Sequence, residues 1–174
     1  SGLKRAHAVV LTRCDQVSED ALAQTEAQIR RVNPDLAIAR SIHAPTAIRT
    51  TGGAEIPLAQ MKGKRVFAFC GIGNPQAFFR TTERLGTILA GTTAFDAHHR
   101  YTTEELVALR EEARQQQASL VLTTQKDWTK VVQAGLPERD PPLACLTIDL
   151  KITAGEEMLT SLIDRVLGGR IPVQ

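Results

Sequence analysis

Residues 65–75 read RVFAFCGIGNP, and this stretch decides the fold. The short apolar run at its start predicts a buried strand over residues 65–70. Asn74 is a good N-cap, and Pro75 suits the first helical position, where its missing N–H would have no partner anyway. The stretch therefore predicts a strand, a tight turn and a helix that continues to about Leu85.

The same alternation of strand and helix repeats on both sides of this stretch. Apolar runs predict further strands at 8–11, 36–42, 87–94, 120–123 and 143–148. Amphipathic stretches with capping signals predict helices at 18–32, 102–117, 125–133 and 155–167. Residues 44–63 are rich in proline and glycine and are interpreted as a loop with a short hairpin. This order predicts a single α/β domain over residues 1–174, a three-layer α/β/α arrangement with a mostly parallel, Rossmann-like sheet.

The composition is that of a globular protein in a reducing compartment. Apolar residues make up 43% of the chain, which is enough for a core. The formal net charge of +2 is too small to indicate a nucleic-acid partner. The three cysteines are far apart in sequence and predict free thiols, and no Cys-x-x-Cys pair supports a zinc site.

Polar loops follow the predicted strands, at the sheet edge where ligands gather in parallel α/β proteins. These loops are 12–15, 70–74, 95–101 and 123–127.

Two of these loops carry the candidate cofactor-binding residues. Gly71, Gly73 and Asn74 form a turn before a helix, where backbone N–H groups favour anions. Lys126 lies at the next such helix start and adds an ammonium group. The alternatives are a tight turn without a ligand, because no third glycine completes a dinucleotide motif, and a capped helix with a solvated lysine.

Asp96, His98 and His99 form the densest polar cluster and are the candidate catalytic residues. A histidine here would act as a general base, a metal ligand or a phosphate contact. The simpler alternative is a histidine that bonds to the backbone. We predict no metal site in this chain, because adjacent histidines without further ligands hold a metal poorly.

Two catalytic motifs are absent from the sequence. No Gly-x-x-x-x-Gly-Lys-[Ser/Thr] loop is present to hold the β- and γ-phosphates of a nucleotide, and no Gly-x-Ser-x-Gly indicates a serine hydrolase.

Taken together, the loops resemble those of the tetraacyldisaccharide 4'-kinases. The family has an apolar strand entering GIGNP and a Phe-Phe pair, an Asp-His-His-x-Tyr-Thr segment, and Thr-Thr-Glu-Lys-Asp. The corresponding stretches here are 65–79, 91–102 and 123–127, and 6–13 and 43–45 also fit. The order and spacing agree over nearly the whole chain.

The resemblance implies a carboxy-terminal lobe of a two-lobe kinase. Such enzymes use ATP and Mg²⁺ to phosphorylate the 4'-hydroxyl of a tetraacyldisaccharide 1-phosphate in lipid A biosynthesis, peripherally at the cytoplasmic face of the inner membrane. The P-loop belongs to the amino-terminal lobe, the expected partner. The fragment alone is then expected to be inactive and to bind no cofactor tightly. His99, with His98, is expected to reach the phosphates or the metal-bound water.

Two positions depart from the family pattern. Ala97 stands where the family has Asp before His-His, so that Asp96 is the available substitute. Gln125 replaces a Glu, which removes a charge but keeps hydrogen-bonding capacity. Two other hypotheses stay open: a stand-alone α/β module that binds a phosphorylated ligand or partner without catalysis, and, ranked lower, a histidine-dependent phosphatase or metal hydrolase.

Overall fold

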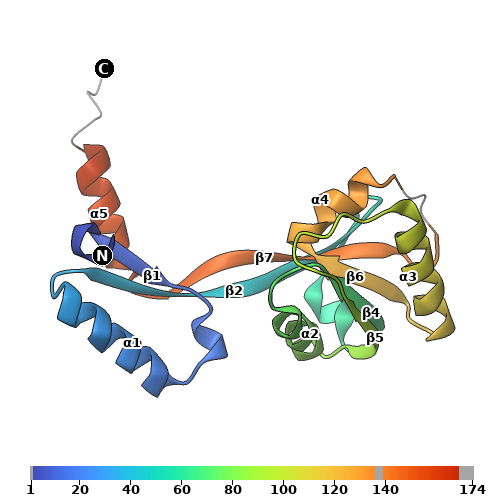
Figure 1. Cartoon of the computed structure of the whole chain (residues 1–174), viewed down its shortest axis with the longest axis horizontal. Coiled ribbons are helices and arrows are strands. Elements are labelled where there is room, and N and C mark those ends of the chain that lie inside the picture. The colour runs from blue at the N-terminus through green and yellow to red at the C-terminus, as the bar shows by residue number, and fades with distance from the viewer. Residues whose placement is uncertain (1, 136–138, 169–174) are drawn as a thin grey trace. The chain divides into compact units, whose positions relative to one another are not determined.

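A computed structural model describes residues 2–135 and 139–168 as an alternation of strands and helices (Figure 1). The strands are β1 Ala8–Leu11, β2 Ala37–Thr50, β3 Glu55–Ile56, β4 Arg65–Cys70, β5 Ile88–Ala94, β6 Leu120–Thr124 and β7 Leu143–Ala154. The helices are α1 Glu19–Val32, α2 Pro75–Arg84, α3 Thr103–Gln115, α4 Gln125–Gln133 and α5 Glu156–Gly168. None of the helices in this described part is long and apolar enough to cross a membrane.

The sheet is mixed but mostly parallel. Its strand order is β1-β2-β7-β6-β4-β5, and β3 pairs with β2. Parallel pairing joins β1 to β2, β4 to both β5 and β6, and β6 to β7. The predicted α/β class with a mostly parallel sheet is therefore confirmed.

Strands β2 and β7 are longer than predicted. The interpretation of residues 44–50 as loop is wrong, although the hairpin with β3 is present. Pro45 does not end β2, because the Thr147 hydroxyl accepts from Ala47 N at 3.0 Å and so bonds the backbone just beyond the proline. Thr51 N donates to Leu143 O at 3.2 Å. From Ala47 to Thr51 the partner moves back from Thr147 to Leu143, so β2 and β7 run in opposite directions.

Residue contacts divide the chain into two compact units. Unit 1 comprises Ser1–Ala44 and Asp149–Gln174, and unit 2 comprises Pro45–Ile148. Both units contain part of β2 and part of β7. The single domain over residues 1–174 stays a prediction at this level.

Unit 2 has a buried core on each face of its sheet. Val66, Ala68 and Cys70 of β4 pack with Phe78 and Phe79 of α2. The alternate β4 residues, Phe67 and Phe69, face the other way and pack with Leu106 and Leu109 of α3 and Val131 of α4. This period of two along β4 is what a strand covered by helices on both sides requires.

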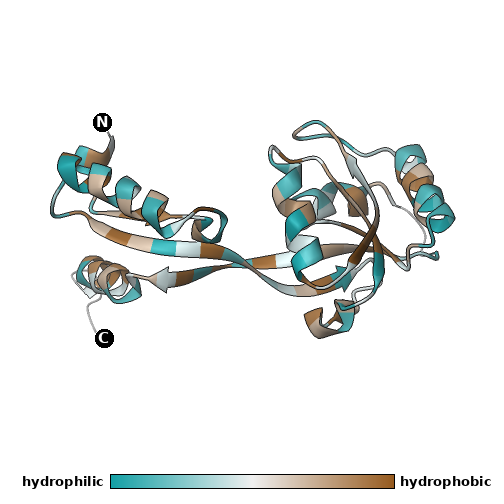
Figure 2. Ribbon diagram, turned by 90° about the horizontal axis from the view of Figure 1, so that it is seen from below, coloured by the Kyte–Doolittle hydropathy of each residue, from teal (hydrophilic) through white to brown (hydrophobic). Residues whose placement is uncertain are grey.

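Unit 1 has a smaller core. Ile29 of α1 packs with Leu36 and Ile38, while Ser18 caps the helix by accepting from Ala21 N. Gly155, at φ +79°, lies where a Cβ would be 2.5 Å from Ile38 O, so this turn needs glycine. Helix α5 has no buried residue within the described part of the chain. The helices alternate teal and brown along their turns, as amphipathic helices do (Figure 2).

Candidate functional site

The loops that follow β4, β5 and β6 meet at one edge of unit 2. These three strands are parallel neighbours, so their carboxyl ends lie together. Phe95 N donates to Cys70 O at 2.9 Å, and His98 N donates to Gly71 O at 3.1 Å. The structure thus brings loops 70–74, 95–101 and 123–127 together, whereas loop 12–15 belongs to unit 1.

Asp127 lies at the centre of this meeting point, and the sequence analysis did not single it out. Its side chain is fully buried. One carboxylate oxygen, Oδ2, accepts from Gly71 N at 2.9 Å and from Thr124 Oγ1 at 2.8 Å. The other, Oδ1, accepts from Lys130 Nζ at 3.3 Å. A buried carboxylate needs such donors, because an unpaired charge in the interior is costly.

Gly71 is needed because the loops approach it closely. A Cβ at this position would lie 3.0 Å from Tyr101 Oη, 3.1 Å from Asp96 O and 3.2 Å from His99 Cβ. Its N–H is also already bonded to Asp127, so that this group is not aimed at a ligand. Gly71 therefore joins two loops, as a tight turn without a ligand would, and its assignment to a cofactor stays a prediction.

His99 is held by its neighbours. Its ring stacks on Phe95, with centroids 4.5 Å apart, and meets Tyr101 edge-on at 5.0 Å. Its Nε2 lies 3.0 Å from Glu105 Oε2. The Thr102 backbone N–H, and after it His99, hold the pKa of the Glu105 carboxyl below its usual value. Within the described residues, the carboxylate that contacts this imidazole is that of Glu105, not that of Asp96.

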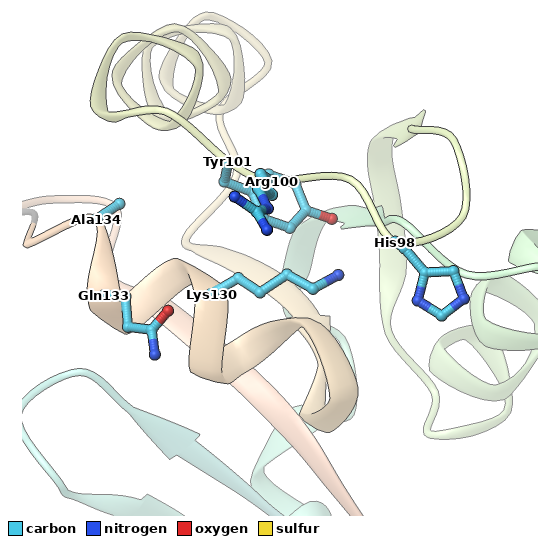
Figure 3. Close-up of a pocket in the computed structure, with 6 residues that line it drawn as sticks. All are labelled: His98, Arg100, Tyr101, Lys130, Gln133 and Ala134. Carbon is cyan, nitrogen blue, oxygen red and sulfur yellow. The ribbon is translucent and has the colours of Figure 1, made fainter.

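His98 faces a different environment. It has a left-handed backbone, at φ +70°, a conformation that non-glycine residues adopt at some cost. Its side chain lines a cavity of about 490 Å³ together with Arg100, Tyr101, Lys130, Gln133 and Ala134. Figure 3 shows the side chain of Lys130 extending along the cavity toward His98, with Arg100 and Tyr101 above it in this view. Nitrogen-bearing side chains thus dominate this cavity.

The other predicted site residues lie outside this cavity. Lys126 is exposed, and the lysine that lines the cavity is Lys130, one helical turn further along α4. Gly73 is exposed with open space around it, and Asn74 caps α2 by accepting from Ala77 N at 3.1 Å. Asp96 is exposed, and its backbone carbonyl accepts from His99 N.

Gln125 serves as a hydrogen-bond acceptor. Its Oε1 accepts from Ile148 N at 3.1 Å, which fastens the start of α4 to β7. A glutamate would supply the same oxygen with a charge. Gln125, in place of the Glu of the family pattern, therefore keeps an acceptor for Ile148 N.

Two groups near the site are held in their neutral forms. Burial raises the pKa of the Tyr101 phenol, and the Asp127 charge raises it further. Burial likewise raises the pKa of the Cys70 thiol to about 11. Neither group supplies an anionic nucleophile at neutral pH. Between residues 2 and 135 and between 139 and 168, no three His, Cys, Asp or Glu side chains lie close enough to hold a metal ion.

The arrangement suits the binding of an anionic group beside the His98 loop. The family model described as tetraacyldisaccharide-1-P 4'-kinase matches residues 1–168. The chain belongs to the tetraacyldisaccharide 4'-kinase family. A curated family member from Syntrophobacter fumaroxidans is 36% identical over 171 residues, covering 97% of this chain and 43% of that relative.

Other relatives agree with this assignment. The tetraacyldisaccharide 4'-kinase of Bradyrhizobium diazoefficiens is 47% identical over 88 residues, covering 50% of this chain and 26% of that protein. The crystal structure of LpxK from Aquifex aeolicus in complex with ATP has a TM-score of 0.57 at 22% identity, covering 94% of this chain and 44% of that one. At that identity the match shows the shared fold. The chain spans less than half the length of the tetraacyldisaccharide 4'-kinases it matches over most of its length.

Proposed function

We propose that this chain is the carboxy-terminal part of a tetraacyldisaccharide 4'-kinase. The whole enzyme would transfer the γ-phosphoryl group of ATP to the 4'-hydroxyl of a tetraacyldisaccharide 1-phosphate in lipid A biosynthesis. The observation that carries the proposal is the family match over residues 1–168. The chain lacks a P-loop, so the proposed enzyme needs a further lobe that supplies one. A stand-alone binding module without catalysis is not favoured by this match.

The residues of this chain would bind and position phosphate in that reaction. Phosphoryl transfer depends on positioning and on neutralising the charge of the phosphate oxygens. Arg100 and Lys130 provide cationic donors at the cavity, and His98 provides a ring nitrogen. These donors fit the phosphates of ATP. They do not fit Mg²⁺, which prefers oxygen ligands, so we assign no residue of this chain to the metal.

The histidine loop would supply the catalytic residues of this lobe. We assign His98 to the phosphate group because it lines the cavity. His99 is oriented by Glu105 and Phe95. It would reach the phosphates only when the P-loop lobe of the enzyme lies against this loop. Asp96 is the carboxylate available in place of the family's Asp before His-His.

The remaining parts of the proposal follow from the family. The partner of this chain would be the amino-terminal P-loop lobe, and the substrate would be the lipid A disaccharide precursor. The enzyme would work peripherally at the cytoplasmic face of the inner membrane. No nucleic-acid partner is proposed, since the net charge is only +2.

The test is a phosphoryl-transfer assay on the full-length gene product. The purified protein is incubated with γ-labelled ATP, Mg²⁺ and tetraacyldisaccharide 1-phosphate, and the lipid products are separated. Labelled 4'-phosphate is expected from the full-length protein, and none from residues 1–174 alone. No transfer by a folded full-length protein that carries an intact P-loop would overturn the proposal.

A variant tests the altered motif directly. Ala97→Asp in the full-length enzyme restores the carboxylate of the family pattern and is expected to raise turnover. An unchanged rate would show that Asp96, or no carboxylate at all, serves in this loop.

A further inference from the structure

The cavity at the edge of unit 2 concentrates basic side chains from two elements. His98 and Arg100 come from the loop after β5, and Lys130 comes from α4. These are nitrogen donors, and two of them are permanently cationic at neutral pH. Cationic donors that line one recess favour the binding of an anionic group there.

A buried carboxylate holds Lys130 at this cavity. The side chain of Lys130 is 26% exposed, whereas that of Asp127 is fully buried, and their charged atoms lie 3.3 Å apart. Holding a flexible lysine in one rotamer removes part of the entropy that binding would otherwise cost. The contact therefore pre-organises the ammonium group for a ligand.

The same carboxylate fixes the backbone that carries His98. Asp127 accepts from Gly71 N, and the carbonyl of Gly71 accepts from His98 N at 3.1 Å. His98 is held in a left-handed conformation at this point. One carboxylate thus holds both residues: Lys130, which lines the cavity from α4, and His98, which lines it from the loop after β5.

We propose that the cavity lined by His98, Arg100 and Lys130 binds a phosphate group, and that Asp127 is the positioning residue that holds Lys130 and the His98 backbone for it. The phosphate would come from the nucleotide or from the sugar 1-phosphate. This choice of source rests on the proposed function, whereas binding of phosphate itself does not.

The experiment is a titration of the ¹⁵N-labelled chain with tripolyphosphate, followed by NMR. Saturable shifts are expected at the amides of Gly71, His98 and Lys130. Lys130→Met should weaken the affinity about tenfold or more, since it removes a charged hydrogen bond. Lys130→Arg should retain most of the affinity. Lys126→Met, which changes an exposed lysine one turn away with the same loss of charge, should leave it unchanged.

A second variant tests the positioning role. Asp127→Asn keeps the shape of the side chain but removes the charge that holds Lys130, so it should weaken the affinity while the spectrum away from the cavity stays folded. If this variant does not fold, the comparison of Lys130→Met with Lys126→Met still tests whether the cavity binds phosphate. Equal affinity in Lys130→Met and the unaltered chain, or no saturable shift at millimolar tripolyphosphate, would overturn the proposal.

Two further titrations identify the source of the phosphate. Stronger binding of ATP than of glucosamine 1-phosphate would assign the cavity to the nucleotide, and the reverse order would assign it to the sugar phosphate. If the chain binds no phosphate while the full-length protein still transfers phosphoryl groups, this inference fails and the proposed function stands.

Discussion

The two units of the chain differ in how their cores are built. Unit 2 buries aliphatic and aromatic residues on both faces of β4, including Phe67, Phe69 and Phe78. Unit 1 buries the small cluster around Ile29 and Ile38, and beside it Arg40 pairs with Glu19 and Glu26 at 2.7 and 2.6 Å. These carboxylates raise the pKa of the Arg40 guanidinium further.

The difference shows where the site obtains its rigidity. The loops that meet at Asp127 all follow strands of the better-buried unit, and each is fastened by hydrogen bonds to its neighbour. Most α5 residues are exposed, including Ile163 at 56% and Val166 at 65%. A fixed binding geometry is best supported by closely packed strands, and that is where this chain places its candidate residues.

The largest contrast is expected between the cores of the two units. Phe67→Ala removes a fully buried ring and should lower the free energy of unfolding by about 3–5 kcal/mol. Ile163→Ala, on the exposed side of α5, should cost about 0.5 kcal/mol or less. Urea unfolding of both variants measures this. Similar costs would mean that α5 is packed as closely as β4.

A smaller contrast is expected within the glycine turn. Gly71→Ala places a Cβ within 3.0–3.2 Å of Tyr101 Oη and His99 Cβ. This crowding should cost about 1–3 kcal/mol. Gly73→Ala meets open space and should change stability by about 0.5 kcal/mol or less. Thermal unfolding of the two variants compares them, and a larger cost at Gly73 would contradict the described packing of this turn.

Loss of a helix N-cap should destabilise the protein by about the same amount in both units. Ser18→Ala removes the acceptor for Ala21 N in unit 1, and Thr102→Ala removes the acceptor for Glu105 N in unit 2. Each loss should lower the free energy of unfolding by about 1 kcal/mol. Denaturant titrations check this. A cost several times larger at Thr102 would show that the capping box also supports the His99 loop.

The smallest effect concerns acid stability at Glu105. Its pKa in the folded state lies below the ordinary value of 4.5, so its contribution is present above that value and is lost as the pH falls through the folded pKa. Glu105→Gln should therefore destabilise the protein at neutral pH and reduce the loss of stability on acidification. Melting temperatures between about pH 7 and about pH 3 measure this. If the melting temperature of Glu105→Gln depends on pH as in the unaltered chain, the Thr102 and His99 contacts do not lower the pKa of Glu105 as assigned.

Local signals let the sequence predict much of the fold. The strand at 65–70, the Asn74 cap and the capping box at Thr102 were predicted correctly, because each depends on residues within one turn. The extension of β2 past Pro45 was missed. It depends on Thr147, about a hundred positions away in sequence, and no local pattern reports such a contact.

The site was predicted only as a set of loops. The sequence placed the loops after β4, β5 and β6 at one sheet edge, together with loop 12–15, and it named Lys126 but not Lys130. Lys126 and Lys130 are four residues apart on nearly the same face of α4, so which lysine lines the cavity depends on its position along the helix. The spacing of Thr124, Asp127 and Lys130, each three residues apart, was the signal that would have identified the carboxylate.

The most direct test of this account is native-state hydrogen exchange at the Gly71 amide. Because this N–H donates to the buried Asp127 carboxylate, its exchange should be as slow as that of the β4 core and much slower than that of α5. In Asp127→Ala, which removes this acceptor, the Gly71 amide should lose more protection than the amides of the β4 core. Rapid exchange at Gly71 in the unaltered chain would contradict the central claim, that one buried carboxylate fastens the loops of the site.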